Sequence, residues 1–192
     1  MRATFVAARA FPLLALVLLV LSGCGAQEAD VKAPTPAQAR AELAGSPAAL
    51  ASLHGQAAQL LDGGLDAYRA RLEALGGHPV VVNAWASWCP PCRTEMPYFA
   101  RAAVRFGRRV AFLGIDAGDN DADARAFLRD HYVPYPSYVD PHDQIAHEVG
   151  VRAGLPTTVF YGRDGKIAYV HQGQYRDEAA LTADVRRYAG AS

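Results

Sequence analysis

Two cysteines separated by two residues, Cys89 and Cys92, are the residues of this chain best suited to do chemistry. They follow a buried-strand pattern over residues 79–85 and lead into a helical pattern, so Cys89 is expected at a helix tip and Cys92 one turn inside. Unpaired backbone N–H groups and the positive end of the helix dipole favour a thiolate there, and the thiolate is the species that attacks disulfides. The pair therefore predicts thiol–disulfide exchange, with Cys89 as nucleophile and Cys92 as the resolving residue.

A structural role for the same pair is the alternative. A structural zinc site usually needs four Cys or His ligands in close clusters, but the chain has only three cysteines and its six histidines are scattered. A disulfide that closes so short a loop adds little stability, because the loop-closure entropy grows with loop length. We therefore expect a redox pair, and neither a metal nor a cofactor.

The charge balance argues against nucleic acid as a partner. The chain has 19 basic and 19 acidic residues, and Arg2 and Arg9 are the only charged residues before Cys24. A chain that begins at Cys24 would carry 17 basic residues against 19 acidic ones. Such a chain lacks the basic excess that binds a phosphate backbone.

Residues 1–23 are predicted to be a secretory signal. Two arginines precede an apolar core over residues 11–21, which is shorter than the roughly 20 apolar residues that a transmembrane helix needs. The core ends in Leu-Ser-Gly before Cys24, a junction that resembles the lipobox of bacterial lipoproteins. This predicts lipid modification of Cys24 and a place in the bacterial cell envelope, outside the cytoplasm. An ordinary cleaved signal or an uncleaved anchor is the alternative.

The segment after Cys24 is expected to be a flexible tether over residues 24–45, followed by a folded domain over residues 46–192 with a helical N-terminal extension. Thr35-Pro36 and Ser46-Pro47 each place a capping hydroxyl before a proline and predict helix starts. Helical spacing runs from Ser46 to Leu60 and again over residues 65–75. A short strand near residues 56–61 is an open alternative.

The rest of the chain predicts an α/β fold. Apolar strand patterns over residues 79–85 and 110–115 alternate with helical patterns over 95–106 and 121–132, which indicates parallel strands covered on both faces. Strand patterns over 157–161 and 166–171, joined by an Asp-Gly turn, predict an antiparallel hairpin. A last helix is expected over residues 177–188.

The run over residues 82–97, Val-Asn-Ala-Trp-Ala-Ser-Trp-Cys-Pro-Pro-Cys-Arg-Thr-Glu-Met-Pro, resembles the active-site signature of thioredoxin-like proteins. More narrowly, it is similar to the TlpA, ResA and CcmG group of extracytoplasmic reductases, and the resemblance covers residues 64–188. It implies a thioredoxin-like fold, in which helices flank a mixed sheet made of a parallel βαβ part and a C-terminal antiparallel hairpin. Residues 116–141 match an insertion that is typical of this group.

The resemblance also assigns further site residues. It implies that Pro97 kinks the active-site helix, that Pro156 is preceded by a cis peptide bond and faces the cysteines, and that the backbone of Leu155 binds an extended substrate. The remaining active-site neighbours within the motif are Trp88, Pro90 and Pro91.

One departure from thioredoxin concerns the proton acceptor. Thioredoxin has a buried acid on the strand before the motif, where this chain has Asn83, which cannot exchange a proton near neutral pH. In ResA-like relatives an acid after the second strand stands beside the cysteines, and Asp119 is at the matching place. The alternative is that Asp119 belongs to a solvated acidic loop with Asp116, Asp121 and Asp123.

The resemblance implies reduction of disulfides in exported proteins, with electrons from a membrane thiol donor and cytochrome c maturation as the pathway. A disulfide-forming oxidase is the first alternative, although Pro90-Pro91 lacks the His of strongly oxidising relatives. A lipid-tethered binding or copper-delivery module is the second, although such relatives separate their cysteines by three residues. A peroxidase reading is weaker still, because a Thr-x-x-Cys setting is absent.

Overall fold

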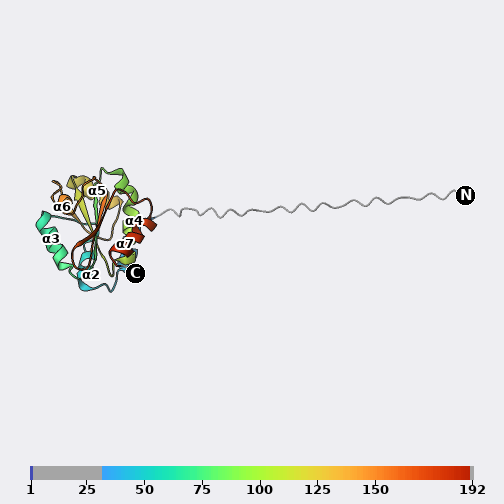
Figure 1. The fold of residues 1–192 in the computed structure, drawn as a ribbon, viewed down its shortest axis with the longest axis horizontal. Helices are drawn as coiled ribbons and strands as arrows, with labels where there is room; N and C mark the ends of the chain where they lie inside the picture. The colour runs from blue at the N-terminus through green and yellow to red at the C-terminus, as the bar shows by residue number, and fades with distance from the viewer. Residues whose placement is uncertain (2–31, 191–192) are drawn as a thin grey trace.

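A six-stranded sheet in the order β1-β4-β3-β2-β5-β6 forms the centre of the fold (Figure 1). The computed structural model describes Met1 and residues 32–190, so the predicted signal and Cys24 lie outside the described residues. The strands are β1 (Leu60–Leu61), β2 (Val80–Trp85), β3 (Ala111–Ala117), β4 (Ser137–Asp140), β5 (Thr157–Tyr161) and β6 (Ile167–Gln172). The helices are α1 (Pro36–Glu42), α2 (Ala48–His54), α3 (Gly64–Ala74), α4 (Pro90–Phe106), α5 (Asp121–Asp130), α6 (Gln144–Glu148) and α7 (Glu178–Tyr188).

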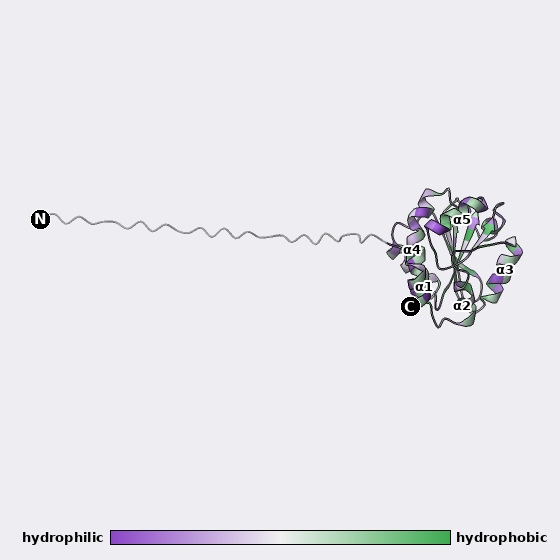
Figure 2. Cartoon of the chain, turned by 180° about the vertical axis from the view of Figure 1, so that it is seen from behind, coloured by the Kyte–Doolittle hydropathy of each residue, from purple (hydrophilic) through white to green (hydrophobic). Residues whose placement is uncertain are grey.

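The sheet has a parallel and an antiparallel part, as the sequence predicted. Strands β1, β4, β3 and β2 pair in parallel, whereas β5 pairs antiparallel with β2 and with β6. Every residue of β2 and β3 is buried, because α4 and α7 lie on one side of the sheet and α3 and α6 on the other (Figure 1). The outer faces of the helices are largely hydrophilic and the central strands largely hydrophobic (Figure 2).

Alternate residues of β2 belong to two separate apolar clusters, one on each side of the sheet. Val81 and Trp85 pack on the side of α4 and α7, together with Phe99 and Phe160. Val80, Val82 and Ala84 pack on the opposite side, with the buried leucines of α2 and the apolar residues of α3 and α6. Since side chains alternate along a strand, a central strand buried on both faces reads as the continuous apolar run of residues 79–85.

The N-terminal region differs from the prediction in two respects. The helix expected from Ser46 to Leu60 ends at His54, and the alternative short strand forms instead as β1, which pairs with Ser137 and Tyr138 of β4. The helix start predicted at Thr35-Pro36 is confirmed: Thr35 caps α1 with a capping box, and Ala39 is buried, although residues 24–45 were expected to form a flexible tether. The folded part therefore begins before residue 46.

Residues 116–141 and the segment after them contain two elements that the sequence analysis did not identify. Strand β4 is only four residues long and helix α6 only five. Both are too short for their apolar residues to show a periodic pattern in the sequence. Helix α4 begins at Pro90 with Cys89 as its N-cap, which confirms the helix tip expected at Cys89, although the helical pattern extends only over residues 95–106. Within residues 32–190, no helix is long and apolar enough to cross a membrane.

Candidate active site

The two cysteines lie where the chain leaves β2 and enters α4, and they form a disulfide. The S–S distance is 1.99 Å and the Cα atoms are 5.3 Å apart. Cys89 is the N-cap of α4, and its Sγ atom accepts a hydrogen bond from the backbone N–H of Cys92 at 3.3 Å. Pro90 occupies the first helical position, where its missing N–H costs nothing. Cys89 and Cys92 are 2% and 1% exposed, so the two differ little in burial in this disulfide form.

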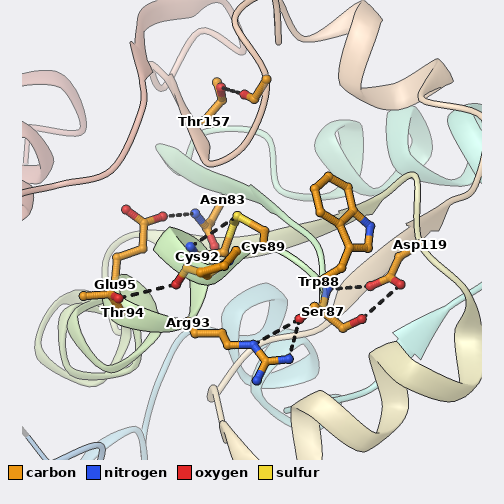
Figure 3. Close-up of a disulfide and its surroundings, with 12 residues drawn as sticks. Asn83, Ser87, Trp88, Cys89, Cys92, Arg93, Thr94, Glu95, Asp119 and Thr157 are labelled. Carbon is orange, nitrogen blue, oxygen red and sulfur yellow. Dashed lines mark hydrogen bonds between the residues drawn. A yellow bond between two sulfur atoms is a disulfide. The ribbon is translucent and has the colours of Figure 1, made fainter.

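Asp119 holds the loop that leads into the cysteines. Its carboxylate accepts hydrogen bonds from the backbone N–H of Ser87 at 2.5 Å and from the Ser87 hydroxyl at 3.0 Å (Figure 3). The carbonyl oxygen of Ser87 in turn accepts from Arg93 Nε at 3.1 Å and Nη2 at 2.7 Å. Ser87 is thus fixed from both sides, two residues before Cys89.

Trp88 is the most exposed large apolar side chain of residues 32–190, at 60%, and its indole N–H donates to the carbonyl oxygen of Gly118 at 3.1 Å. A cleft of about 330 Å³ has Trp88 and Leu155 among its lining residues. The Leu155–Pro156 peptide bond is cis, as the resemblance implied, and Leu155 packs against the apolar cluster that contains both cysteines. An extended chain that binds along Leu155 would therefore pass close to the disulfide.

Glu95 is a site residue that the sequence analysis did not assign. It lies in α4 three residues after Cys92, a spacing that places two helical side chains on the same face. The residue is fully buried, and its carboxylate accepts from the Asn83 side chain at 2.9 Å and from the backbone N–H of Tyr175 at 3.1 Å. Figure 3 shows Glu95 and Asn83 on one side of the disulfide and Asp119 on the other.

The environment of Glu95 suits proton exchange. Burial raises the pKa of this carboxyl group to about 7, against the opposing effect of the hydrogen bonds from Tyr175 and Asn83. A group with such a pKa can accept or release a proton at neutral pH. One signal in the sequence could have identified it: Glu95 is an acidic residue on the face of α4 that otherwise carries Met96, Phe99 and Ala103.

The acidic run after β3 divides into buried and exposed members. Asp116 is buried at the end of β3, and Asp119 bonds to Ser87 as described above. Asp121 and Asp123 are exposed in the first turn of α5. The solvated-loop alternative therefore describes the last two residues, whereas Asp119, in the loop after β3, is hydrogen-bonded to Ser87 in the loop that precedes the cysteines.

Comparisons with known proteins agree with this geometry. The sequence model of the AhpC/TSA family matches residues 54–170. The chain is 36% identical over 94 residues to the thiol:disulfide interchange protein DsbE homolog of Paracoccus denitrificans, a match that covers 48% of this chain and 50% of that protein. It is 30% identical over 106 residues to the thiol-disulfide oxidoreductase ResA of Bacillus subtilis, covering 55% and 59% respectively. The chain thus spans only part of the length of both relatives.

Solved structures give the same fold. A Chlorobium tepidum protein assigned as a thiol:disulfide interchange protein DsbE is 27% identical, with a TM-score of 0.57 over 62% of this chain and 85% of that one. A second protein from that organism, described as a thioredoxin family protein, superposes with a TM-score of 0.55 at 23% identity, over 62% and 84% of the two chains. The chain therefore has the thioredoxin-like fold and belongs to the AhpC/TSA family.

Proposed function

We propose that this chain is a thiol–disulfide oxidoreductase that works through Cys89 and Cys92. The observation that carries the proposal is the closed disulfide between these residues at the N-terminus of α4. The buried Glu95 on the face of Cys92 and the packing of Leu155 against the same apolar cluster support it. The descriptions of the relatives as thiol-disulfide oxidoreductase and thiol:disulfide interchange protein support it further.

In the proposed reaction the chain begins as a dithiol, and the Cys89 thiolate attacks one sulfur of a substrate disulfide. The substrate S–S bond breaks, an S–S bond to Cys89 forms, and the released substrate thiolate takes up a proton. Cys92 then transfers its proton to Glu95 and attacks the Cys89 sulfur. This releases the second substrate sulfur, which also becomes a thiol, and closes the Cys89–Cys92 disulfide present in the structure. The substrate gains two electrons and two protons.

Three features of the fold support this reaction. The N-terminus of α4 stabilises negative charge on Cys89, and the backbone N–H of Cys92 already points at its sulfur. Trp88 and Leu155 border the cleft beside the disulfide, where the substrate chain would bind, with Pro156 next to it. We assign Glu95 as the proton acceptor for Cys92 and Asp119 as a residue that positions the preceding loop.

The reductive direction, the substrates and the donor are also part of the proposal. We propose that the substrates are exported proteins with disulfides, as in cytochrome c maturation, and that a membrane thiol donor restores the dithiol. We further propose that the chain is held in the bacterial cell envelope by lipid on Cys24. The lipobox-like junction is the observation behind that last assignment.

Reduction of insulin disulfides by dithiothreitol tests the activity. The wild-type chain should accelerate the reduction and Cys89→Ser should not, because the attacking thiolate is missing. Equal acceleration by both would contradict the proposal. The direction follows from the reduction potential, which should lie nearer the roughly −270 mV of thioredoxin than the roughly −120 mV of a strong oxidant such as DsbA. A value near the latter would favour the oxidase alternative.

A further inference from the structure

Tyr175, in the loop between β6 and α7, is a buried aromatic residue whose side chain the proposed reaction does not use. Its hydroxyl donates a hydrogen bond to Asp184 Oδ2 in α7 at 2.9 Å. Its ring stacks on the imidazole of His171 in β6, with centroids 3.9 Å apart and ring planes inclined by 10°. The same ring approaches Phe99 of α4 edge-on, with centroids 6.2 Å apart. The side chain of Tyr175 is therefore held by contacts with three different elements.

The hydroxyl of Tyr175 stays a donor to Asp184 at neutral pH. Burial raises the pKa of this phenol, and the hydrogen bond to Asp184 and the negative charge of Asp184 raise it further. The same carboxylate oxygen lies 3.9 Å from His171 Nδ1, so Asp184 meets both rings of the stacked pair. Asp184 belongs to α7, whose buried Leu181 and Val185 lie in the apolar cluster that contains both cysteines. The anchor of the Tyr175 hydroxyl is therefore part of a packed helix.

The backbone of the same loop binds two parts of the active site. The N–H of Tyr175 donates to Glu95 Oε2 at 3.1 Å. Two residues earlier, the N–H of Gly173 donates to the carbonyl oxygen of the cis proline, Pro156, at 2.9 Å. Gly173 has a φ of 91°, a conformation that glycine adopts without steric cost and that lets the chain turn as it leaves β6. One short loop therefore joins the cis proline to the proposed proton acceptor.

The two oxygen atoms of Glu95 are bound from different elements. Asn83 of β2 donates to Oε1 at 2.9 Å, and the loop before α7 donates to Oε2 through Tyr175. A carboxylate with one donor at each oxygen is held in one plane, whereas a single donor leaves its broad terminal torsion free to rotate. Tyr135, before β4, is a further titratable group near Glu95, and burial and the Glu95 charge both raise its pKa, so it stays neutral. The orientation of Glu95 thus depends on Asn83 and on the loop that Tyr175 anchors.

We propose that Tyr175 is a positioning residue for the proton transfer from Cys92: Asp184 and His171 hold its side chain, and its backbone N–H thereby fixes the carboxyl group of Glu95. The inference rests on the proposed function, in which Glu95 is the proton acceptor. The hydrogen bond from the Tyr175 N–H stabilises the ionised form of Glu95, which is the form that accepts a proton. A loosened loop should therefore raise the pKa of Glu95 and leave its carboxyl group less well oriented. The attack by Cys89 does not use Glu95 and should not change.

Single-turnover reduction of a protein disulfide, stopped by acid at a series of pH values, separates the attack by Cys89 from the resolution by Cys92. Tyr175→Phe keeps the ring and removes only the hydroxyl that binds Asp184. Attack should keep the wild-type rate, whereas resolution at pH 7 should slow by about threefold to tenfold, as for one lost hydrogen bond. The pH at which resolution reaches half of its maximal rate should rise by about 0.5 unit. Tyr188→Phe is the matched control, because the Tyr188 hydroxyl has no hydrogen-bond partner among the described residues although its ring stacks on Tyr169.

Two variants of the acceptor separate positioning from a general loss of stability. Asp184→Asn keeps an oxygen that can accept from the Tyr175 hydroxyl and should follow the wild-type pH profile. Asp184→Ala has no acceptor and should reproduce the slower resolution and the shifted midpoint of Tyr175→Phe. Two results would overturn the proposal: an unchanged midpoint in Tyr175→Phe, or the same shift in Tyr188→Phe.

A measurement on the unmutated disulfide form covers the case in which the variants misfold, and it needs no substrate. In an NMR titration, the amide proton of Tyr175 should respond with the same midpoint as the carboxyl carbon of Glu95, near pH 7. Different midpoints, or no response of the Tyr175 amide, would contradict the proposal. If the two groups titrate together but insulin reduction fails, the proposed function is wrong and the positioning of Glu95 by Tyr175 stands.

Discussion

At the scale of single residues, the proton-acceptor role predicted for Asp119 is assigned to Glu95 in our proposal, and Asp119 positions the loop before the cysteines. Asn83, where the resemblance places the acid of thioredoxin, donates a hydrogen bond to Glu95, so a buried carboxyl group of helix α4 lies beside this strand position. The sequence shows that residue 83 is Asn, but it does not show that the side chain of Asn83 contacts Glu95. For this reason the sequence alone points to an acid after β3, whereas Glu95 lies within the motif itself.

Glu95→Gln should slow the second half of the reaction by on the order of 100-fold, because general-base assistance to Cys92 is lost while the attack by Cys89 is unaffected. Rapid-quench experiments with acid trapping should therefore show accumulation of the mixed disulfide. Glu73→Gln, at an exposed position of α3, is the matched control and should resolve at the wild-type rate. Normal resolution in Glu95→Gln would remove this residue from the mechanism.

The same residue predicts a pH dependence of stability. Folding raises the pKa of Glu95 from 4.5 to about 7, so the folded state binds a proton that the unfolded state has lost in this range. The stabilisation is complete below pH 4.5 and is lost as the pH rises through 7. Relative to Glu95→Gln, the wild-type free energy of unfolding should fall by on the order of 3 kcal/mol between pH 4.5 and 8, measured by urea denaturation. A pH-independent difference would contradict the assigned shift.

At the scale of elements, the long apolar strands and the helices next to them could be predicted, whereas the short elements were foreseen only in part: the starts of α1 and α2, and β1 as an alternative, but neither β4 nor α6. Strands β2 and β3 are buried on both faces, so their sequences are continuous apolar runs. Strand β1 has two residues, and the sequence offered it only as an alternative to a longer helix, because its partners come from the distant strand β4. The start of α1 could be predicted from Thr35-Pro36, but its packing could not, because its seven mostly small and polar residues bury only Ala39.

Leu53→Ala tests whether α2 belongs to the folded unit. Leu53 is fully buried in the apolar cluster on the α3 and α6 side of the sheet, so its truncation should lower the free energy of unfolding by about 2–5 kcal/mol. The neighbouring Ser52 is exposed, and Ser52→Ala should change stability by less than about 0.5 kcal/mol. Equal stability of the two variants would mean that α2 does not pack as described.

At the scale of the whole molecule, the cysteines, the cis proline and both acids meet at one edge of the sheet. Parallel strands β2 and β3 end at this edge with Trp85 and Asp116 side by side, and the loops that follow carry Cys89 and Asp119. Such edges are where open α/β folds place their sites. The motif and its position could be predicted from the sequence; the packing of Glu95 and Asp116 depends on contacts between distant segments and could not.

The membrane attachment can be tested on the complete chain. Cys24→Ser removes the sulfur that would carry the lipid, so the protein should move from the membrane fraction to the soluble extracytoplasmic fraction. Cell fractionation followed by a high-salt wash measures this. A variant that stays with the membranes after the wash would indicate an uncleaved apolar anchor and would contradict the assignment of Cys24.

The central claim is that Cys89 attacks and Cys92 resolves, and trapping of mixed disulfides tests it most directly. Each single variant, Cys92→Ser and Cys89→Ser, is reduced, incubated with a protein disulfide, quenched with acid and separated on a non-reducing gel. Cys92→Ser should trap a mixed disulfide through Cys89, because the attacking thiolate at the tip of α4 remains and the residue that releases the substrate is gone. Cys89→Ser should trap almost nothing. Equal trapping by the two variants, or trapping by Cys89→Ser alone, would contradict the account.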